Sequence, residues 1–499
     1  MRGSILVCGT HSDAGKSAVV AGLCRWLRRA GVRVAPFKAQ NMSLNSVVTG
    51  DGAEVARSQA VQAAAAGIEP EAAMNPILLK PSGERRSQLI VMGRPRAEVD
   101  ARGYLALKER LQPVIATALA SLRERFEVVV CEGAGSCAEV NLRSSDLVNL
   151  GLAADAGLPV LIVADIDRGG VFASLVGTLA LADPRDQAHI AGFVINRFRG
   201  DRRILAPGLH ELQRLTGRPV LGVLPHVDGL SLDAEDSLDL ARLPAGEGRI
   251  EVAVVRHRWI SNFTDVDALI AEPDVSVRFT RSPAEVERAD LVILPGTKAT
   301  VQDLERMRAD GLEGPLRRRA AAGRPTLGIC GGYQMLGERI IDRVESGRGE
   351  VRGLGLLPVT TTFERDKLLR RRVGHCGWLG TGASGYEIRH GRVRAHGGEP
   401  LLLASDGEAE GCRLGSVLGL SWHGALEHDG FRRAFLRWVS PAFTAGSRAF
   451  SSVREARLEL LGDLVEEHLD LGRVGAIING GPPRGLPVLR TELSACCAC

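Results

Sequence analysis

The sequence lacks any apolar run long enough to cross a membrane, because none approaches the roughly 18 uninterrupted apolar residues that a spanning helix requires. Aromatic residues are scarce, at 4% of the 499 residues. No charge of one sign dominates, since 63 basic side chains are scattered among 59 acidic ones, and this argues against a nucleic-acid-binding protein. Residues 1–7 run directly into a predicted strand, so we expect no signal peptide and a cytoplasmic protein without a membrane partner.

The ten cysteines are dispersed and form no disulfide framework. Cys8, Cys24 and Cys131 fall within predicted strands or helices, so we expect buried thiols in a reducing compartment. A C-C-x-C cluster lies at residues 496–499. Because no second ligand cluster is evident, a disordered tail is favoured over a metal site.

Glycine is abundant, with 59 residues, and suits the tight strand-to-helix turns of an α/β protein. Short apolar runs alternate with helical patterns such as residues 17–30. Unbroken apolar runs are typical of parallel strands that are buried on both faces. The predicted strands of a first series span residues 4–8, 33–37, 128–131, 160–164, 191–195 and 219–224, and those of a second series span residues 250–255, 276–279, 291–294 and 326–329.

The order of these patterns predicts how the chain is divided. Residues 1–230 and 250–440 are predicted as two α/β domains, joined by an acidic, glycine-containing linker at 231–249. Residues 479–499 are rich in Gly and Pro and are expected to be disordered. Residues 441–478 are predicted as a helical segment, with a helix over 453–471 whose apolar stripe contains Leu458, Leu461, Val465 and Leu469.

A phosphate-binding loop is predicted at Gly9-Thr-His-Ser-Asp-Ala-Gly15-Lys16-Ser17, between a strand and a helix. Backbone N–H groups at a helix N-terminus bind phosphate, the lysine adds positive charge, and the serine hydroxyl ligates Mg²⁺. Five residues separate the two glycines, one more than in the usual P-loop, and this form resembles the loop of dethiobiotin synthetase. A chance glycine-rich turn is the weaker reading. The residues expected to bind ATP are Thr10, Asp13, Ala14, Gly15, Lys16 and Ser17.

Three strand-end residues are predicted to complete the ATP site. Glu132 ends an apolar strand, and its carboxylate is a candidate Mg²⁺ ligand beside Ser17. Lys38 leaves the second strand near the expected path of the phosphate, although a solvated lysine accounts for it nearly as well. Asn196 ends a further strand and is a weaker candidate for contact with adenine.

The stretch Gly328-Ile-Cys330-Gly-Gly332 has the form of a nucleophile elbow between a strand and a helix. A thiolate at a helix N-terminus can attack the amide of glutamine and release ammonia. His423 is the candidate base, since it follows a later apolar strand, although a structural histidine is the alternative. Backbone N–H groups near Gly331 and Gly296 are the predicted oxyanion donors.

A third catalytic member is not evident from the sequence. Ala425 stands two residues after His423, where triad amidotransferases usually carry Glu, and nearby Glu427 is not favoured as a substitute. The thiol site is therefore predicted as a dyad. Together the two motifs predict an amide synthase, because ATP can activate a carboxylate as an acyl phosphate while glutamine supplies unprotonated ammonia.

The chain resembles the cobyric acid synthase family over residues 4–471, with Lys38-Ala-Gln-Asn-Met-Ser43 as the most specific run. The resemblance implies a dethiobiotin-synthetase-like P-loop domain followed by a class I glutamine amidotransferase-like α/β domain. It implies ATP, Mg²⁺ and glutamine as cofactor and cosubstrates, and amidation of the b, d, e and g carboxylates of adenosylcobyrinic acid a,c-diamide to adenosylcobyric acid. The matching stretches are residues 9–17, 36–46, 75–81, 132–136, 139–142, 165–172, 195–201, 260–265, 295–298 and 328–336.

The resemblance also implies roles for individual residues. Cys330 is then the thioester nucleophile and His423 its partner, in a family that lacks the usual glutamate. Glu54 is implied as a further metal ligand. Two stretches depart from the family pattern: Arg389 replaces histidine in Gly385-Tyr-Glu-Ile-Arg389, and the histidine segment reads Ser-Trp-His-Gly-Ala. Candidate contacts to the corrinoid are Asn41, Asn45 and Arg168.

Three other functions remain open at this stage. Cobyrinic acid a,c-diamide synthase uses the same two chemistries, but the run after Lys38 argues against it. A partitioning-type ATPase would carry an extra lysine where this loop has His11, and it would not need the thiol elbow. A ligase fed by free ammonia would leave the second domain without a catalytic role. The sequence does not fix the oligomeric state, and a homo-oligomer remains open.

Overall fold

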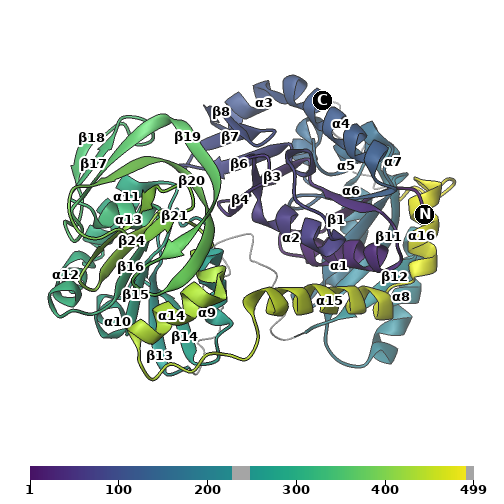
Figure 1. The fold of residues 1–499 in the computed structure, drawn as a ribbon. Helices are drawn as coiled ribbons and strands as arrows, with labels where there is room; N and C mark the ends of the chain where they lie inside the picture. Colours follow the sequence, from purple (N-terminus) through teal and green to yellow (C-terminus); the bar gives the residue numbers. More distant parts are fainter. Residues whose placement is uncertain (228–247, 490–499) are drawn as a thin grey trace.

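The computed structural model describes residues 1–227 and 248–489, which form two α/β domains lying side by side (Figure 1). Within these ranges, no helix combines the length and the apolar character that a membrane span needs. Residues 231–247 of the predicted linker lie outside the described residues, as does the C-C-x-C cluster.

The first domain is built on a six-stranded sheet in which every neighbouring pair is parallel. All six strands overlap those predicted from unbroken apolar runs, so this part of the fold prediction is confirmed. In spatial order the strands are β12 (Val220–Pro225), β11 (Ile190–Phe198), β10 (Val160–Asp165), β1 (Gly3–Gly9), β9 (Val128–Glu132) and β2 (Val34–Phe37).

Alternate residues of β1 enter opposite faces of this sheet, as the two-residue repeat of a strand requires. Leu6 and Cys8 join a buried cluster with α4, α5 and α6. Ile5 and Val7 join a second cluster with α1 and α2. The helices of this domain are α1 (Lys16–Arg29), α2 (Arg57–Ala66), α3 (Ala101–Ala106), α4 (Lys108–Arg125), α5 (Leu150–Ala156), α6 (Val171–Leu181), α7 (Pro184–Gln187) and α8 (Arg202–Thr216), with 3-10 turns η1 (Ala72–Met74) and η2 (Val140–Ser145).

The C-terminal helices belong to the first domain and do not form a segment of their own. The helix predicted over 453–471 is α15 (Phe450–His468), which runs back from the second domain and packs along α1 (Figure 1). Gly22 of α1 permits this contact, because a Cβ there would lie 2.6 Å from the carbonyl oxygen of Leu461. The next helix, α16 (Leu471–Gly480), packs against β1. Buried in this contact are Leu458, Leu461, Val465, Leu469, Val474 and Ile478.

Residues 479–489 are ordered, contrary to the tail that was expected to be disordered over 479–499, and residues 490–499 lie outside the described residues. Helix α16 continues to Gly480, and Leu489 donates its backbone N–H to Gln187 while accepting a hydrogen bond from that side chain. Pro487 accepts a hydrogen bond from the buried guanidinium of Arg218. Residues 481–489 are thus bound to the first domain.

The second domain has its own six-stranded sheet, parallel apart from one antiparallel edge strand. Its four predicted strands are confirmed. In order the strands are β14 (Val275–Thr280), β13 (Ile250–Val255), β15 (Leu291–Leu294), β16 (Thr326–Ile329), β24 (Val417–Leu420) and β23 (Cys412–Leu414). Its helices are α9 (Asp267–Ile270), α10 (Pro283–Arg288), α11 (Thr300–Ala309), α12 (Glu313–Ala321), α13 (Gly331–Leu336) and α14 (Asp429–Val439), with 3-10 turns η4 (Phe263–Val266) and η5 (Ala425–Glu427).

Antiparallel strands that were not predicted lie where the domains meet. The long ribbon of β19 (Val359–Cys376) and β20 (Thr381–Ala395) contacts β4 of the first domain. Strand β19 is rich in charged residues and carries no unbroken apolar run, which explains why it was missed. The remaining strands of the two domains, which include the parallel pairs β3–β6 and β17–β19, are β3 (Gln40–Met42), β4 (Ser46–Val48), β5 (Glu54–Ala56), β6 (Ile77–Pro81), β7 (Ser87–Val91), β8 (Arg94–Val99), β17 (Arg339–Asp342), β18 (Gly349–Arg352), β21 (Leu402–Ala404) and β22 (Ala409–Glu410).

Candidate active sites

The phosphate loop joins β1 to α1 and is fixed by Asn196. Gly15 lies in the left-handed region at φ 99°, and a Cβ there would lie 2.0 Å from the Nδ2 atom of Asn196. Asn196 donates a hydrogen bond of 3.0 Å to the carbonyl of Ala14. Asn196 therefore holds the loop, and its contact with adenine stays a prediction. The buried hydroxyl of Thr10 has no hydrogen-bond partner among the described residues.

Lys16 is the first residue of α1, and its amine lies within the loop. It donates hydrogen bonds of 3.2 Å to the carbonyl of His11 and 3.0 Å to the carbonyl of Gly135. The helix N-terminus and the ammonium group therefore lie together, which is the arrangement that binds a phosphate.

Glu132 connects Ser17 with Lys38. Its carboxylate is fully buried at the end of β9 and accepts hydrogen bonds from Ser17 (2.8 Å) and Lys38 (3.0 Å) on Oε1, and from Gln62 on Oε2. A hydroxyl and a carboxylate at this spacing fit Mg²⁺, which usually takes one or two protein ligands and completes its shell with phosphate and water. The sequence prediction did not include Gln62.

Asp13 would place a negative charge beside a bound phosphate, and two arginines neutralise it. Arg168 lies 3.0 Å and Arg197 3.1 Å from its carboxylate. Arg197 also pairs with Asp165 at 2.8 Å. Burial lowers the pKa of the Arg197 guanidinium, but the two carboxylates outweigh burial and raise it. Because Asp13 is neutralised by these arginines, the positive charge of Lys16 remains available in the loop.

Glu54 has partners different from those of Ser17 and Glu132. One oxygen of its fully buried carboxylate lies 2.8 Å from Lys80, and the other lies 2.6 Å from Lys367 of β19. Burial would raise the pKa of Glu54, but the two lysines outweigh it and hold the pKa far below its usual value. A metal ion would have to displace both lysines, so the arrangement favours a role in joining the domains over the predicted role as a metal ligand.

Two of the predicted corrinoid contacts are buried in contacts within the protein. Asn41 is 2% exposed, and its Nδ2 atom donates to Ser58 (3.1 Å) and Gln59 (2.9 Å). Asn45 is 1% exposed, and its Oδ1 atom accepts a hydrogen bond of 3.2 Å from the backbone of Phe263 in the second domain. Arg168 is 49% exposed, and it is the one of the three that faces solvent.

Cys330 sits on a sharp turn between β16 and α13. Its φ of 50° and ψ of −105° are strained for a non-glycine residue. The turn is fixed by two backbone hydrogen bonds, from Cys330 to Leu420 (2.8 Å) and from Gly332 to Pro295 (3.1 Å). A Cβ at Gly332 would lie 1.9 Å from a carbonyl oxygen, so glycine is required. These features have the form of the predicted nucleophile elbow.

The imidazole of His423 lies between a thiol and a carboxylate, so the thiol site has a third member. The Nδ1 atom of His423 donates to Asp265 at 2.7 Å, and the ring also forms a hydrogen bond with Cys330. The other oxygen of Asp265 accepts the backbone N–H of Gly424 at 2.7 Å. Burial would lower the pKa of His423, but Asp265 and Cys330 outweigh it and raise the pKa to about 10. The three side chains thus lie in the arrangement of a catalytic triad, with one member more than the predicted dyad of Cys330 and His423.

Asp265 was missed because it precedes Cys330 in the chain. Triad amidotransferases usually carry Glu two residues after the histidine, and this chain has Ala425 at that position. Glu427 points elsewhere: it pairs with Arg57 at 2.6 Å and with Arg454 at 2.8 Å. The only sequence signal for Asp265 was that it lies in the stretch 260–265, which matched the family pattern but to which no role was assigned.

The loop that carries Gly296 touches the triad. A Cβ at Gly296 would lie 2.8 Å from Cε1 of His423, and a Cβ at Gly331 would lie 2.7 Å from a side-chain carbon of Thr297. Both glycines therefore permit close packing around the sulfur. The N–H of Gly331 belongs to the first turn of α13, where backbone donors have no partner within the helix.

Comparison with known proteins places this chain in a family. A family model described as a CobQ/CobB/MinD/ParA nucleotide binding domain matches residues 5–240, and one described as a CobB/CobQ-like glutamine amidotransferase domain matches residues 251–431. The cobyric acid synthase of Frankia casuarinae is 57% identical, over 98% of this chain and 99% of the relative. Those of Streptomyces avermitilis and Streptomyces coelicolor are each 54% identical over the same shares.

The chain belongs to the cobyric acid synthase family. The predicted family, the fold class and the class of enzyme, a glutamine-dependent ligase with a nucleotide-binding domain, are thereby confirmed.

One of the two stretches that were predicted to depart from the family pattern lies beside the thiol. The Sγ atom of Cys330 is 3.8 Å from the carbonyl oxygen of Ile388. The next residue, Arg389, is 9% exposed in its side chain and pairs with Glu387 at 2.5 Å. Burial lowers the pKa of Arg389, but Glu387 and Glu410 outweigh burial and raise it. Arg389 thus places a positive charge near Cys330.

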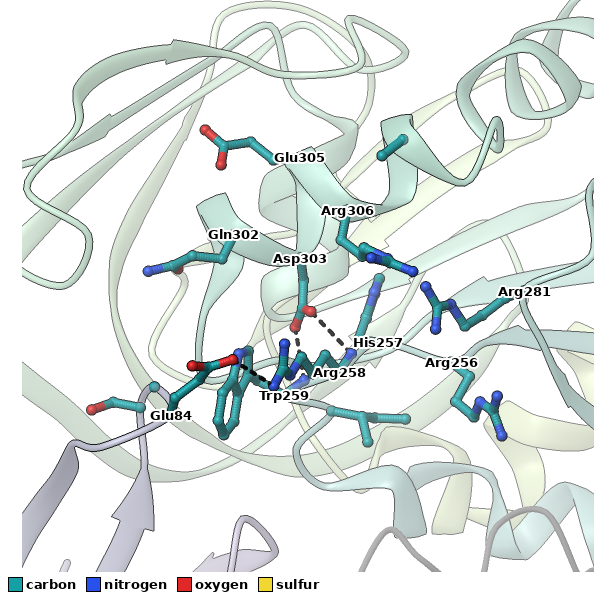
Figure 2. A pocket seen from close by; sticks show the side chains of 14 residues that line it. Glu84, Arg256, His257, Arg258, Trp259, Arg281, Gln302, Asp303, Glu305 and Arg306 are labelled. Atoms are coloured by element: carbon teal, nitrogen blue, oxygen red, sulfur yellow. Dashed lines mark hydrogen bonds and ion pairs between the residues drawn. The ribbon is translucent and has the colours of Figure 1, made fainter.

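A basic cleft of about 820 Å³ is lined by Asp303 and by the arginines Arg256, Arg258, Arg281 and Arg306 (Figure 2). Asp303 accepts the backbone N–H groups of Arg258 (3.0 Å) and Trp259 (3.2 Å), and Arg258 reaches Glu84 of the first domain at 2.9 Å. None of the predicted site residues lines this cleft. Asp303 also accepts a hydrogen bond from Thr297, so it helps to fix the loop that carries Gly296 and Thr297.

Proposed function

We propose that this chain uses ATP and glutamine to amidate the b, d, e and g carboxylates of adenosylcobyrinic acid a,c-diamide, giving adenosylcobyric acid. The observation that carries the ammonia half of this proposal is the buried contact series Asp265–His423–Cys330. Near full-length similarity to cobyric acid synthases supports this product over that of the a,c-diamide synthase. We expect the reaction to take place in the cytoplasm.

The second domain would release ammonia at Cys330. The thiolate attacks the side-chain amide carbon of glutamine, and the N–H groups of Gly331 and of the Gly296 loop stabilise the oxyanion. The imidazolium of His423 then protonates the leaving nitrogen. Ammonia departs, and a γ-glutamyl thioester remains on Cys330. His423 next takes a proton from water, which cleaves the thioester to glutamate. Asp265 keeps Nδ1 protonated, so that Nε2 faces the sulfur.

The first domain would use ATP to activate the acceptor carboxylate by phosphorylation. A carboxylate oxygen attacks the γ-phosphorus of ATP. ADP is the leaving group, and the carboxylate becomes an acyl phosphate. Lys16 and the first turn of α1 bind the phosphates and stabilise the charge that builds up during transfer. Ser17 and Glu132 would hold Mg²⁺, whose charge neutralises phosphate oxygens when bound. Ammonia then attacks the acyl carbon and expels phosphate, which completes the amide.

Other residues are proposed to support the ATP site. The buried hydroxyl of Thr10 and the backbone of Asp13 and Ala14 lie in the loop that would wrap the phosphates. Lys38 is proposed to contact the transferred phosphoryl group; in support of this, Lys38 and Ser17 both donate hydrogen bonds to one oxygen of Glu132. Arg168 is the remaining candidate contact for the corrinoid.

Exchange of the nitrogen donor tests this assignment. With Cys330→Ala we expect no amidation from glutamine but full activity with ammonium, because only the thiol is lost. A matched control is Cys412→Ala, which removes another buried thiol of the same domain. A Cys330→Ala protein that still amidates with glutamine would exclude Cys330 as the nucleophile.

A further inference from the structure

The basic cleft lies where the strand order of the second sheet reverses. Strand β13 is the first of this sheet in the chain, and β14 and β15 lie on either side of it, both parallel to it. Open α/β sheets bind ligands at such a point, in the crevice outside the carboxyl ends of the strands. The cleft is lined by residues 256–260 after β13, by Arg281 after β14 and by residues of α11, which follows β15. Cys330 follows β16, so the proposed thiol chemistry leaves this crevice unused.

Arginine side chains from three segments give the cleft its positive charge. Arg281 (2.8 Å) and Arg306 (3.1 Å) both pair with the single carboxylate of Asp310, so one of their two charges is not neutralised. The side chain of Arg256 makes no ion pair with any residue that the structure describes. Because a guanidinium group presents a planar fork of N–H donors, these arginines suit an anion such as a phosphate or a carboxylate.

The acidic residues of the lining do not cancel this charge. Glu305 pairs with Arg348, which lies outside the lining, at 3.6 Å. Glu84 of the first domain pairs with Arg258 at 2.9 Å, but the two side chains are 74% and 61% exposed, so this pair contributes little and an anion can replace the carboxylate. Asp303 is buried, and its oxygens accept hydrogen bonds from the backbone N–H groups of two lining residues. The cleft therefore keeps a net positive charge.

Two ring side chains of the lining suit the uncharged part of a ligand (Figure 2). Trp259 is partly exposed, and its indole offers a flat surface on which a planar ring can stack. The buried Nε2 atom of His257 has no hydrogen-bond partner in the part of the chain that the structure describes. Burial lowers the pKa of His257 in spite of the nearby Asp303, so the imidazole is neutral near pH 7. A buried nitrogen without a partner is costly, and a polar ligand would supply one.

We propose that this cleft is a further small-molecule site, which binds a phosphorylated planar ring of the nucleoside monophosphate class. Arg256, Arg281 and Arg306 would hold the phosphate, and Trp259 would stack on the ring. The volume of about 820 Å³ suits such a ligand, since small-molecule sites usually measure about 300–1,000 Å³. The site is separate from the proposed amidation, because none of the residues assigned to that reaction lines the cleft.

Isothermal titration calorimetry of the full chain with GMP and with FMN tests the site, and titrations with guanosine and with inorganic phosphate separate the two parts of the ligand. We expect one nucleotide, GMP or FMN, to bind per chain. Guanosine and phosphate should each bind at least about 10-fold more weakly than the nucleotide, because each lacks part of the contacts. Arg256→Ala and Arg306→Ala should each weaken nucleotide binding about 10-fold, since a hydrogen bond between charged groups is lost.

Arg278→Ala is the matched control, because Arg278 lies on β14, is 58% exposed and does not line the cleft. Its affinity for the nucleotide should equal that of the unaltered chain. Lys16→Ala shows whether the nucleotide binds at the phosphate loop instead, and binding should persist in this variant. Circular dichroism confirms that each variant is folded.

Four results overturn the proposal. They are the absence of binding of both nucleotides, the loss of binding in Lys16→Ala, an unchanged affinity in both cleft variants, and an affinity for guanosine or for inorganic phosphate that equals that for the nucleotide.

Discussion

The two candidate sites differ in how the chain assembles them. In the first domain, the loop after β1, the start of α1 and the ends of β2 and β9 meet at one edge of a parallel sheet, around the buried carboxylate of Glu132. In the second, Asp265 and His423, which lie beside Cys330, are 158 residues apart in the chain, and Asp265 precedes Cys330. The first site follows from local motifs at strand ends, whereas the second depends on tertiary packing.

The two candidate sites also differ in the charged groups that they contain. The phosphate site keeps the positive charge of Lys16 in a loop whose own carboxylate, Asp13, is neutralised by two arginines. The thiol site buries an imidazole with its carboxylate, away from solvent. One site is therefore prepared for a polyanion, and the other for proton transfer to and from a small neutral amide.

The largest effect that separates the sites is expected from Lys16→Ala. Loss of the ammonium group removes charge stabilisation from the phosphoryl transfer, so amidation should fall by about 10⁴-fold with either glutamine or ammonium as donor. The check is the initial rate of amide formation with each donor. Retention of amidation with one donor only would mean that Lys16 does not serve the step common to both.

Asp265→Asn should affect the thiol site alone. Glutaminase kcat/KM is expected to fall by about 10³-fold, as for loss of a group that supports general acid–base catalysis. Since Asp265 is a cause of the raised pKa of His423, the alkaline limb of the pH profile should move from near 10 to lower pH. The measurement is glutamate release against pH, with ammonium-dependent amidation as the control. An unmoved alkaline limb would contradict the triad.

Glu54→Gln is expected to weaken the contact between the domains. It leaves Lys80 and Lys367 buried without their shared carboxylate, at a cost of about 3 kcal/mol in the free energy of unfolding. Because the pKa of Glu54 is lowered on folding, its contribution is present above the carboxyl's unfolded pKa and is lost as the pH falls through the lowered one. Urea unfolding at pH 7 measures the loss. If Glu54 were instead a metal ligand, the variant would lose Mg²⁺ dependence at unchanged stability.

Gly22→Ala should have the smallest effect, and it tests whether α15 belongs to the first domain. The added Cβ would meet Val465 at 2.5 Å, and such overpacking costs about 2 kcal/mol. Gly177→Ala is the matched control, since a Cβ in α6 would meet nothing within 4 Å. Thermal unfolding compares the two variants. Equal melting temperatures would argue against the packing of α15 on α1.

The sequence predicted what local patterns encode and missed what tertiary packing decides. The parallel strands of both sheets were found because burial on two faces leaves unbroken apolar runs, and the phosphate loop and the elbow were found because each is a short motif after a strand. Strand β19 was missed because its outward residues are charged. Asp265 was missed because no spacing rule relates it to His423. The packing of α15 on α1 was missed because an apolar stripe predicts that a helix face is buried but not which element covers it.

The account holds that ammonia made at Cys330 is used by the ATP site, and an isotope competition tests this directly. The chain would be supplied with glutamine labelled with ¹⁵N in its amide, together with unlabelled ammonium, ATP, Mg²⁺ and the corrinoid, and the label in the new amides would be measured by mass spectrometry. The account predicts labelled amides from the unaltered chain and unlabelled amides from Cys330→Ala. Labelled amides from Cys330→Ala, or unlabelled amides from the unaltered chain, would contradict it.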